Sequence, residues 1–370
     1  MHVQEYLKTH TYKDLEEEFG IMVSEYDDRV ALNYHQIDSY KHKFNPIVME
    51  CRGLILSKPD NEVLCRSFDR FWNYGEDPKS DEFDITQAKV ADKIDGSLCN
   101  VYHDGAKWHV ATRKMAFAEG LIPNKKKTYA EIFEEAIGDD INDIFAPIST
   151  DLTIIFELVS PETRVVTPYK DKAVYLLDVR NQDGVYLGNE ITRFWTITEN
   201  TKWFYPEVHE FNTWEEVIES SKALPAMEEG YVAQIGSWRI KVKNPAYLAI
   251  AHLRDNGAIT EKRVVKLVMM QDHGEYLLHF PEDMPEFRPY IDAYDTMIED
   301  LYVRWEKNKD IEDQKEFALA IKDCPGQGVL FAMRKGRELH DILEGFTDNY
   351  QVNLLKGYLN RVDSYNTLGR

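Results

Sequence analysis

Lys93 is the residue of this chain whose surroundings best suit covalent chemistry. It opens the run Lys-Ile-Asp-Gly-Ser (residues 93–97), which lies between two predicted strands, residues 87–91 and 98–103. A lysine held where a strand meets a turn can be presented rigidly to a ligand. It becomes a nucleophile only if its pKa is lowered, because an ammonium group has no lone pair with which to attack. By itself, the run fits a surface hairpin with a solvated lysine equally well.

Further charged residues supply what a reaction at this lysine would need. They are an arginine, two acids and a pair of lysines: Arg52, Glu157, Glu229, Lys241 and Lys243. Lys241 and Lys243 are two residues apart in a predicted strand, so both side chains lie on one face. Glu157 interrupts the apolar run 152–159, which is typical of a buried strand with a carboxylate near its end. Considered singly, these residues are also compatible with ion pairs, turns and a solvated edge strand.

Together these residues predict nucleotidyl transfer. The two lysines would bind a triphosphate, stabilise charge on its α-phosphate and lower the pKa of Lys93 by like-charge repulsion. The two carboxylates would recruit a hydrated divalent cation, most simply Mg²⁺. In-line attack by the Lys93 amine would then expel pyrophosphate and leave a lysine–AMP phosphoramidate.

Composition restricts the class of protein and its partners. The 370 residues suffice for two domains, and 43% hydrophobic with 29% charged residues is the balance of a soluble globular chain. The net charge of −21 argues against strong, non-specific binding to nucleic acid, but not against a local phosphate site. The four cysteines form no CxxC pair and no apolar run is long enough to span a membrane. We therefore expect no zinc site, no membrane association and a cytoplasmic location.

The pattern of the chain changes near residue 245. Residues 1–245 alternate helical and strand-like segments, with hairpin signals such as Asp104-Gly105. Residues 246–370 show helical periodicity and almost no strand signal. We therefore predict an α+β fold, in which an N-terminal domain of antiparallel sheets with helices precedes a small all-α C-terminal domain.

The motifs resemble those of the covalent nucleotidyltransferases, a superfamily that comprises ATP-dependent ligases and messenger-RNA capping enzymes. Motifs I, III, IV and V of that superfamily are matched by residues 93–96 (KIDG), 156–159 (FELV), 229–232 (EGYV) and 241–243 (KVK). Two upstream segments, 50–53 (ECRG) and 68–73 (FDRFWN), are more discriminating, and they resemble bacteriophage ATP-dependent RNA ligases of the RNA ligase 1 type. Six motifs in the correct order make the resemblance specific, and it covers roughly residues 30–245.

The resemblance implies a role for each motif residue and makes residues 1–245 an adenylyltransferase domain. Lys93 would be the adenylated nucleophile, and Asp95 would orient it or assist the later steps. Glu157 would bind the ribose of ATP, and Glu229 would hold Mg²⁺ through water. Lys241 and Lys243 would contact the α-phosphate and the leaving group.

The other residues implied in the ATP site surround these motifs: Tyr34, Arg52, Arg70, Trp72, Gly96 and Arg113. Arg52 would serve the nucleotide or the phosphate of an RNA end, with assistance from Arg70. Arg70 departs from the family pattern, since a lysine is expected there. The two cations are not interchangeable where a point charge is needed.

The resemblance further implies a reaction and its partners. An RNA ligase of this type joins 5′-phosphate and 3′-hydroxyl RNA ends through a lysine–AMP and then an adenylated RNA intermediate, in repair of RNA such as broken tRNA. The expected substrate is single-stranded or broken-loop RNA, and an end-healing kinase or phosphatase is an expected partner. We expect a monomer that works in the cytoplasm of a phage-infected bacterial host.

Two other classes remain as alternatives. A DNA ligase or a capping enzyme shares the lysine chemistry, but those families usually place a five-stranded oligonucleotide-binding barrel after motif V. This chain is predicted to be helical there. A non-catalytic nucleic-acid-binding protein would need a basic surface, which the charge of −21 does not favour.

Overall fold

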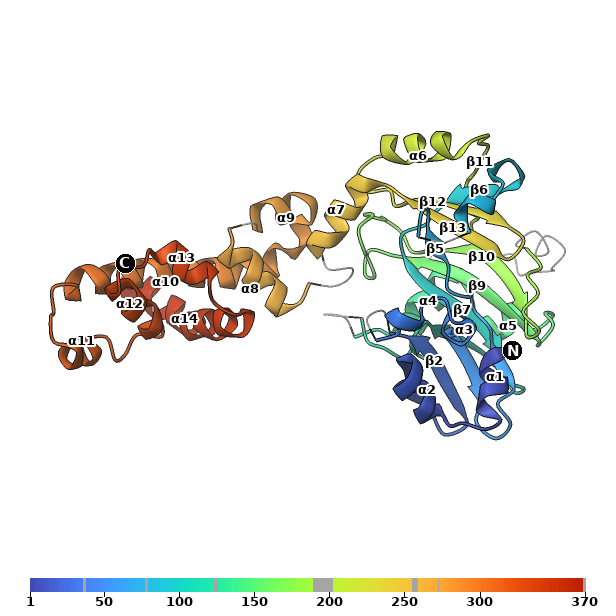
Figure 1. Ribbon diagram of the computed structural model, residues 1–370, viewed down its shortest axis with the longest axis horizontal. Coiled ribbons are helices and arrows are strands. Elements are labelled where there is room, and N and C mark those ends of the chain that lie inside the picture. The colour runs from blue at the N-terminus through green and yellow to red at the C-terminus, as the bar shows by residue number, and fades with distance from the viewer. Residues whose placement is uncertain are drawn as a thin grey trace. The chain divides into compact units, whose positions relative to one another are not determined.

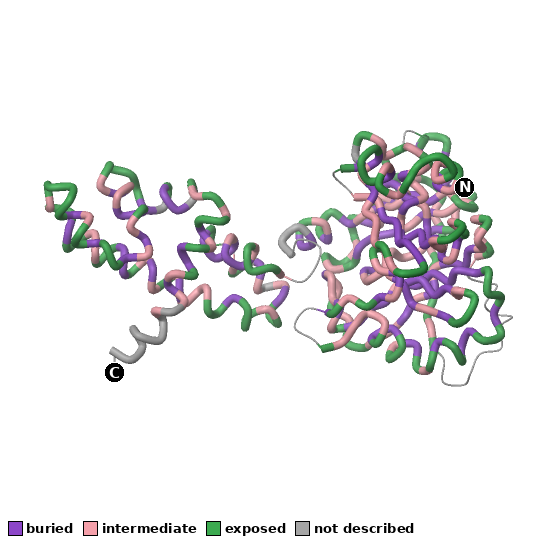
Figure 2. Tube along the Cα trace, turned by 90° about the horizontal axis from the view of Figure 1, so that it is seen from below, coloured by how far each residue is buried: buried purple, intermediate pink, exposed green. Residues whose placement is uncertain are grey.

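The computed structural model describes residues 1–35, 38–76, 79–122, 126–188, 202–254, 259–271 and 273–368. The chain divides into two compact units, Met1–Ala251 and His252–Arg370. Among the described residues, all strands belong to the first unit and the second is helical (Figure 1). Buried positions run through the interior of each unit, so each has a core of its own (Figure 2). The predicted α+β class is confirmed.

The first sheet has the order β1-β2-β3-β4 and is antiparallel throughout. Its strands and the helices near it in sequence are β1 (Ile21–Glu25), β2 (Arg29–Tyr34), β3 (Arg52–Ser57), β4 (Val63–Cys65), α1 (His2–Leu7), α2 (Tyr12–Phe19), η1 (Tyr40–His42) and α3 (Pro46–Glu50). Helix α2 begins after Thr11, whose side chain accepts a hydrogen bond from the Asp14 amide, and ends at Gly20 in the left-handed conformation (φ 65°). Leu15 and Leu32 contribute to the apolar core between helix and sheet.

The second sheet has the order β10-β9-β7-β8 and is also antiparallel. It consists of β7 (Ser97–His103), β8 (Trp108–Thr112), β9 (Leu152–Val159) and β10 (Ala173–Asn181), accompanied by α4 (Tyr129–Ile137) and α5 (Ile141–Phe145). Strand β9 lies inside the sheet, and its Phe156 packs on Phe133 of α4 and Phe145 of α5. Glu157 therefore lies near the end of a buried strand, as predicted.

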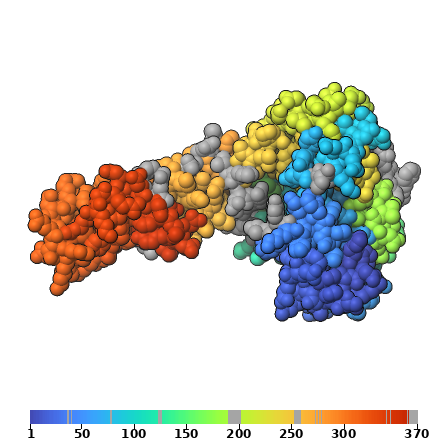
Figure 3. Space-filling model, in the orientation of Figure 1, coloured from blue at the N-terminus to red at the C-terminus, as the bar shows by residue number. Residues whose placement is uncertain are grey.

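The third sheet has the order β11-β6-β12-β13-β5, with β5 parallel to β13 and every other pair antiparallel. Its elements are β5 (Trp72–Asn73), β6 (Lys89–Asp92), β11 (Val208–His209), β12 (Gly230–Ile235) and β13 (Trp238–Lys243), with η2 (Ser80–Glu82), η3 (Ile85–Gln87) and α6 (Trp214–Ala223). Helix α6 (yellow-green) lies against the light-blue segment around η2 in Figure 3, where Trp214 Nε1 donates to the Phe83 carbonyl (3.3 Å).

The strands on either side of Lys93 belong to different sheets. Strand β6 pairs with β11 and β12 in the third sheet, whereas β7 pairs with β8 and β9 in the second. The surface-hairpin alternative for residues 93–97 is therefore wrong. The run Lys93–Gly96 is instead the crossing point from one sheet to the other.

The second unit is a helical bundle. Its helices, after α7 (Pro245–Arg254), which spans the division between the units, are α8 (Glu261–Met269), α9 (His273–His279), η5 (Pro281–Asp283), α10 (Met284–Asn308), α11 (Gln314–Ala320), α12 (Gln327–Arg334), α13 (Leu339–Glu344) and α14 (Asp348–Leu368). Helices α8, α10 and α14 pack on one another, and Met297 and Leu355 are fully buried. In the part of the chain that the structure describes, no helix is long and apolar enough to cross a membrane.

Candidate active site

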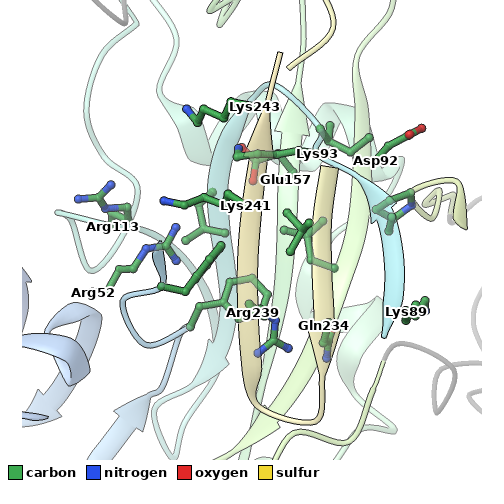
Figure 4. Close-up of a pocket in the computed structure, with 18 of the residues that line it drawn as sticks. Arg52, Lys89, Asp92, Lys93, Arg113, Glu157, Gln234, Arg239, Lys241 and Lys243 are labelled. Atoms are coloured by element: carbon green, nitrogen blue, oxygen red, sulfur yellow. The ribbon is translucent and has the colours of Figure 1, made fainter. Parts of the chain in front are cut away.

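A cavity of about 270 Å³ is lined by residues from all three sheets. Lys93 and Glu157 lie at its centre, and Lys241, Arg52 and Arg113 approach from one side (Figure 4). Lys243 lines the same cavity. Residues that are far apart in the sequence are thus brought into one cluster by the crossing from β6 to β7.

Lys93 is fixed through both its main chain and its side chain. Its backbone amide donates to the Gly230 carbonyl (2.8 Å), and its Nζ donates to Glu229 Oε2 (2.7 Å). The other oxygen, Oε1, pairs with Lys243 Nζ at 2.8 Å. Glu229 is nearly inaccessible, with 5% of its side chain exposed. This buried carboxylate therefore bridges two lysines of the cavity.

Gly96 allows the turn after Lys93 to touch the end of β9. A Cβ atom at this position would lie 2.4 Å from the Leu158 carbonyl oxygen and 3.0 Å from Glu157 Cγ. Strands β7 and β9 pair here, with Leu98 opposite Glu157. The absence of a side chain at Gly96 thus permits the approach that places Glu157 beside Lys93.

The electrostatics of Lys93 differ from the prediction. Burial favours a lower pKa, but the carboxylates of Glu229 and Glu157 outweigh it, so the pKa of Lys93 is raised. The prediction that neighbouring cations lower this pKa is therefore wrong for this structure. The reason is that Glu229 contacts Lys93 directly and stabilises its charged form.

The like-charge effect is found at Lys241 instead. Burial, together with the nearby charges of Lys93, Arg52 and Lys243, lowers the pKa of Lys241 to about 7. Among the described residues, no carboxylate forms an ion pair with it. Lys241 is thus a cation whose charge the fold itself does not compensate.

Glu157 shows the opposite shift. Burial raises the pKa of Glu157 to about 7; the charge of Glu229 adds to the rise, while Lys93 and Arg52 oppose it. Near neutral pH this carboxyl group is therefore partly protonated, and it can either donate or accept a hydrogen bond. Such a group suits a hydroxyl partner, which offers both a donor and an acceptor.

Two arginines and two aromatic rings form the wall beside Lys241. The Arg52 guanidinium lies 5.2 Å from the centre of the Phe71 ring, and Lys241 Nζ lies 5.1 Å from the same ring. Arg52 Nη1 is buried without a hydrogen-bond partner in the described structure. Arg113 lies over the Tyr34 ring at 5.1 Å. A buried donor without an acceptor is costly unless a ligand supplies one, so this wall favours an anion.

Five of the residues predicted for the site do not line this cavity: Gly96 and Glu229, which contact residues that do, and Asp95, Arg70 and Trp72. Asp95 is directed away from Lys93: its carboxylate accepts from the amides of Val166 (2.8 Å) and Thr167 (2.7 Å) and from the Tyr247 hydroxyl (2.7 Å). It thereby anchors a loop and helix α7 to the motif. Arg70 and Trp72 line a neighbouring cavity instead.

Some lining residues were not predicted. Phe71 belongs to the segment 68–73 (FDRFWN), and the alternation of side chains along residues 70–73 predicts that Phe71 and Trp72 face opposite sides. Arg239 lies on the same strand face as Lys241 and pairs with the buried Asp178. Lys89 and Gln234 line the cavity as well. No motif surrounds these two, so the sequence held no signal for them.

The site contains no preformed cluster of three or more metal-ligating side chains within the described ranges. Both oxygens of Glu229 are paired with lysines of the cavity, so this carboxylate could accept a hydrated cation only if one of those contacts were released. Its donor set fits outer-sphere binding of Mg²⁺, which usually retains several waters. Direct coordination by several protein carboxylates does not fit this site.

Comparison with known proteins identifies the family. The family model described as RNA ligase matches residues 50–247, which is more than half of the chain and includes every motif around the cavity. The chain belongs to the RNA ligase family. The predicted phage-type RNA ligase resemblance is thereby confirmed.

The relatives of this RNA ligase family member include viral and phage proteins. A putative bifunctional polynucleotide kinase/RNA ligase of Autographa californica nuclear polyhedrosis virus is 27% identical over the whole chain, which spans 55% of that protein. An RNA ligase of Rhodothermus phage RM378 is 24% identical, over 86% of this chain and 88% of the relative. Among solved structures, an archaeal ATP-dependent RNA ligase aligns with 74% of this chain and 70% of its own, at 15% identity and a TM-score of 0.44.

Proposed function

We propose that this protein is an ATP-dependent RNA ligase that joins 5′-phosphate and 3′-hydroxyl ends. The observation that carries the proposal is the Lys93–Glu229–Lys243 bridge beside Lys241 and Arg52. It brings together an amine and a cationic wall that line one cavity, and a buried carboxylate that contacts two of the lining lysines. The membership in the RNA ligase family supports the substrate class.

In the first step, ATP would lie with its phosphates against Lys241, Lys243 and Arg52. Bound Mg²⁺ would neutralise part of the triphosphate charge. Glu229 can take a hydrated cation only by loosening its contact with Lys93 or Lys243. Once Lys93 loses that carboxylate, burial and the neighbouring cations favour its neutral form. Its amine would attack the α-phosphate, lose a proton and release pyrophosphate, which leaves a lysine–AMP bond.

The later steps return the enzyme to its starting state. A 5′-phosphate of RNA would attack the lysine-bound AMP, forming an adenylated RNA end and restoring the Lys93 amine. A 3′-hydroxyl would then attack that end and release AMP. Glu157 is proposed to bind the ribose, because its partly protonated carboxyl group suits a hydroxyl. Gly96 and Asp95 would position the motif, with Tyr34, Arg113, Arg70 and Trp72 around the substrates.

The wider setting follows from the family. We propose that residues 1–245 form the adenylyltransferase domain and that 246–370 help to select the RNA. The natural substrate would be single-stranded or broken-loop RNA in RNA or tRNA repair, and the enzyme would act as a monomer in the cytoplasm of an infected host. The name of the bifunctional relative supports a link to an end-healing kinase.

The test is covalent labelling by α-labelled ATP with Mg²⁺. Wild-type protein should acquire label, and Lys93→Ala should abolish it. Lys107→Ala, an exposed lysine in the turn between β7 and β8, serves as the matched control and should label normally. Equal labelling of Lys93→Ala and wild type would contradict the proposal.

Substrate choice is tested separately. We expect a 5′-phosphorylated single-stranded RNA to be sealed in preference to nicked duplex DNA. A preference for the nick would indicate a DNA ligase, and labelling by GTP in place of ATP would indicate a capping enzyme.

A further inference from the structure

A second cavity of about 660 Å³ lies within the N-terminal unit, beside the cavity around Lys93 (the nucleotide cavity). The two cavities share Phe71 and Arg239 on their walls. Four of the ten other residues that line the second cavity are aromatic: Phe44, Trp72, Tyr186 and Trp238. Because Phe71 and Trp72 are consecutive in an extended segment, the first faces the nucleotide cavity and the second faces this one. Ligands in the two cavities would thus be neighbours.

Arg70 places a buried cation in this aromatic cavity. Only 8% of the residue is exposed, and its guanidinium lies between the rings of Tyr34 (4.2 Å) and Trp72 (4.4 Å). Its Nη1 atom is buried and has no hydrogen-bond partner in the described part of the chain. A buried guanidinium with an unused donor is costly unless a ligand brings an acceptor.

The charge around the cavity favours an anion. Asp69 lines it, but both of its oxygens accept from Arg180 (2.9 and 2.7 Å), so this charge is already balanced. Glu82 is the other acid on the wall, and it is exposed. Lys43 lies over the rings of Phe44 (5.1 Å) and Trp72 (5.8 Å). The cavity therefore offers flat aromatic surface together with cations, which suits a base and a phosphate.

We propose that this second cavity binds a terminal nucleotide of the RNA strand, with its base on the exposed ring of Phe44, which packs on Trp72 (4.8 Å between ring centres), and its phosphate on Arg70. The proposal rests on the proposed ligase function and assigns Arg70 and Trp72 to RNA instead of ATP. Single-stranded RNA is commonly held by stacking on aromatic side chains and by cations along its backbone. The shared wall at Phe71 would bring this RNA end next to the adenylated lysine.

Two variants at exposed positions test the assignment. Phe44→Ala removes a ring that is 43% exposed, and Ser237→Trp places a bulky side chain at an exposed turn position on the cavity wall. Each should label with ATP at the wild-type rate. In the sealing of pre-adenylated RNA to an RNA acceptor, each should raise the KM for one RNA strand by about tenfold. Phe44→Ala would do so by the loss of one stacking contact, and Ser237→Trp by filling part of the cavity. Phe44→Trp should preserve the wild-type KM.

The strand whose KM rises identifies the bound end, and a rise for either the donor or the acceptor supports the proposal. Unchanged KM values for both strands in both variants would overturn it. The proposal would also be overturned if ATP labelling fell as much as RNA sealing in these variants, since the second cavity would then bind ATP. Failure of the wild type to label at all would instead contradict the proposed function, so the two failures are distinguishable.

Discussion

Buried charges are balanced in opposite ways in the two units. In the C-terminal unit, Asp300 is 3% exposed and accepts hydrogen bonds from Arg304 Nε (2.7 Å), the Tyr358 hydroxyl (3.0 Å) and Cys324 Sγ (3.6 Å). In the N-terminal unit, cations outnumber acids on the wall of the nucleotide cavity, and Lys241 has no carboxylate partner among the described residues. The charge of Asp300 is therefore paired within the fold, whereas the cations of the nucleotide cavity need an anionic ligand to balance them.

The two clusters of charges, Asp300 with its partners and the cations of the nucleotide cavity, should contribute differently to protein stability and to ligand binding. A charge that the fold satisfies contributes to stability, and removing its partner leaves an uncompensated buried group. A charge that awaits a ligand lowers stability but is available for binding and catalysis. Substitutions in the two clusters should therefore have opposite consequences.

The largest effect is expected for Lys241→Met, which keeps much of the side-chain volume and removes the charge. The rate of lysine adenylation should fall by about 10³-fold, because a preorganised cation at the developing phosphate charge is lost. The melting temperature should equal or exceed that of the wild type, since the cost of burying a lysine without a carboxylate partner is gone. A lower melting temperature together with normal labelling would show that Lys241 stabilises the fold and is not needed for adenylation, contrary to this expectation.

Asp300→Ala should show the reverse pattern. Removal of the acid leaves Arg304 and Tyr358 without their partner, and the free energy of unfolding should fall by about 3 kcal/mol. Adenylation at a temperature well below the transition should be unchanged. Glu306→Ala on the same helix removes only the exposed Glu306–Lys309 pair (2.7 Å) and should change stability by less than about 1 kcal/mol. Chemical denaturation of the three proteins measures both differences.

Gly96→Ala should reduce both stability and adenylation, because Gly96 lies in the segment that crosses from the third sheet to the second and touches β9. The added Cβ would meet the Leu158 carbonyl, and we expect a loss of about 2 kcal/mol of stability together with weaker labelling. Gly274→Ala is the matched control, since no heavy atom of the described residues, apart from its chain neighbours and its own helix backbone, lies within 4 Å of the Cβ that it would add in α9. That control should be neutral or slightly stabilising. Normal stability and labelling in Gly96→Ala would contradict the close approach.

The smallest effect should be seen in the pH dependence of stability. Between about pH 7 and its usual pKa of 10.5, Lys241 is protonated in the unfolded chain and largely neutral in the folded chain. The unfolded state then binds more protons, so the free energy of unfolding rises with pH in this window. Relative to Lys241→Met, the wild type should gain on the order of 1 kcal/mol between pH 7 and 8. Parallel pH profiles of the two proteins would contradict the lowered pKa.

Local patterns in the sequence were sufficient for much of the fold. Thr213 followed three residues later by Glu216 is a typical helix start, and Thr213 is the N-cap residue of α6, with its hydroxyl accepting from the Glu216 amide (3.2 Å). The alternation of Lys241 and Lys243 likewise predicts that both face one side, and both line the cavity. These features depend on neighbours in the sequence, so they can be recognised without the structure.

Features that depend on distant pairing could not be predicted in the same way. The pKa of Lys93 depends on Glu229, which reaches it only because β6 pairs with β12. The separation of Arg70 and Trp72 from the nucleotide cavity depends on the parallel pairing of Trp72 with Ile240. No local pattern specifies which strands become neighbours.

The turn between β12 and β13 determines which side chains the cavity receives. Ile235 pairs with Trp238 across Gly236 and Ser237, and this register places Arg239, Lys241 and Lys243 on the cavity face and the buried Ile240 and Val242 on the other. A one-residue insertion or deletion in the turn would exchange the two faces. The cations would then point into the apolar core while isoleucine and valine lined the cavity. Substitutions in the turn should therefore leave the cationic face of β13 on the cavity. A change in the number of turn residues should remove that face from the cavity.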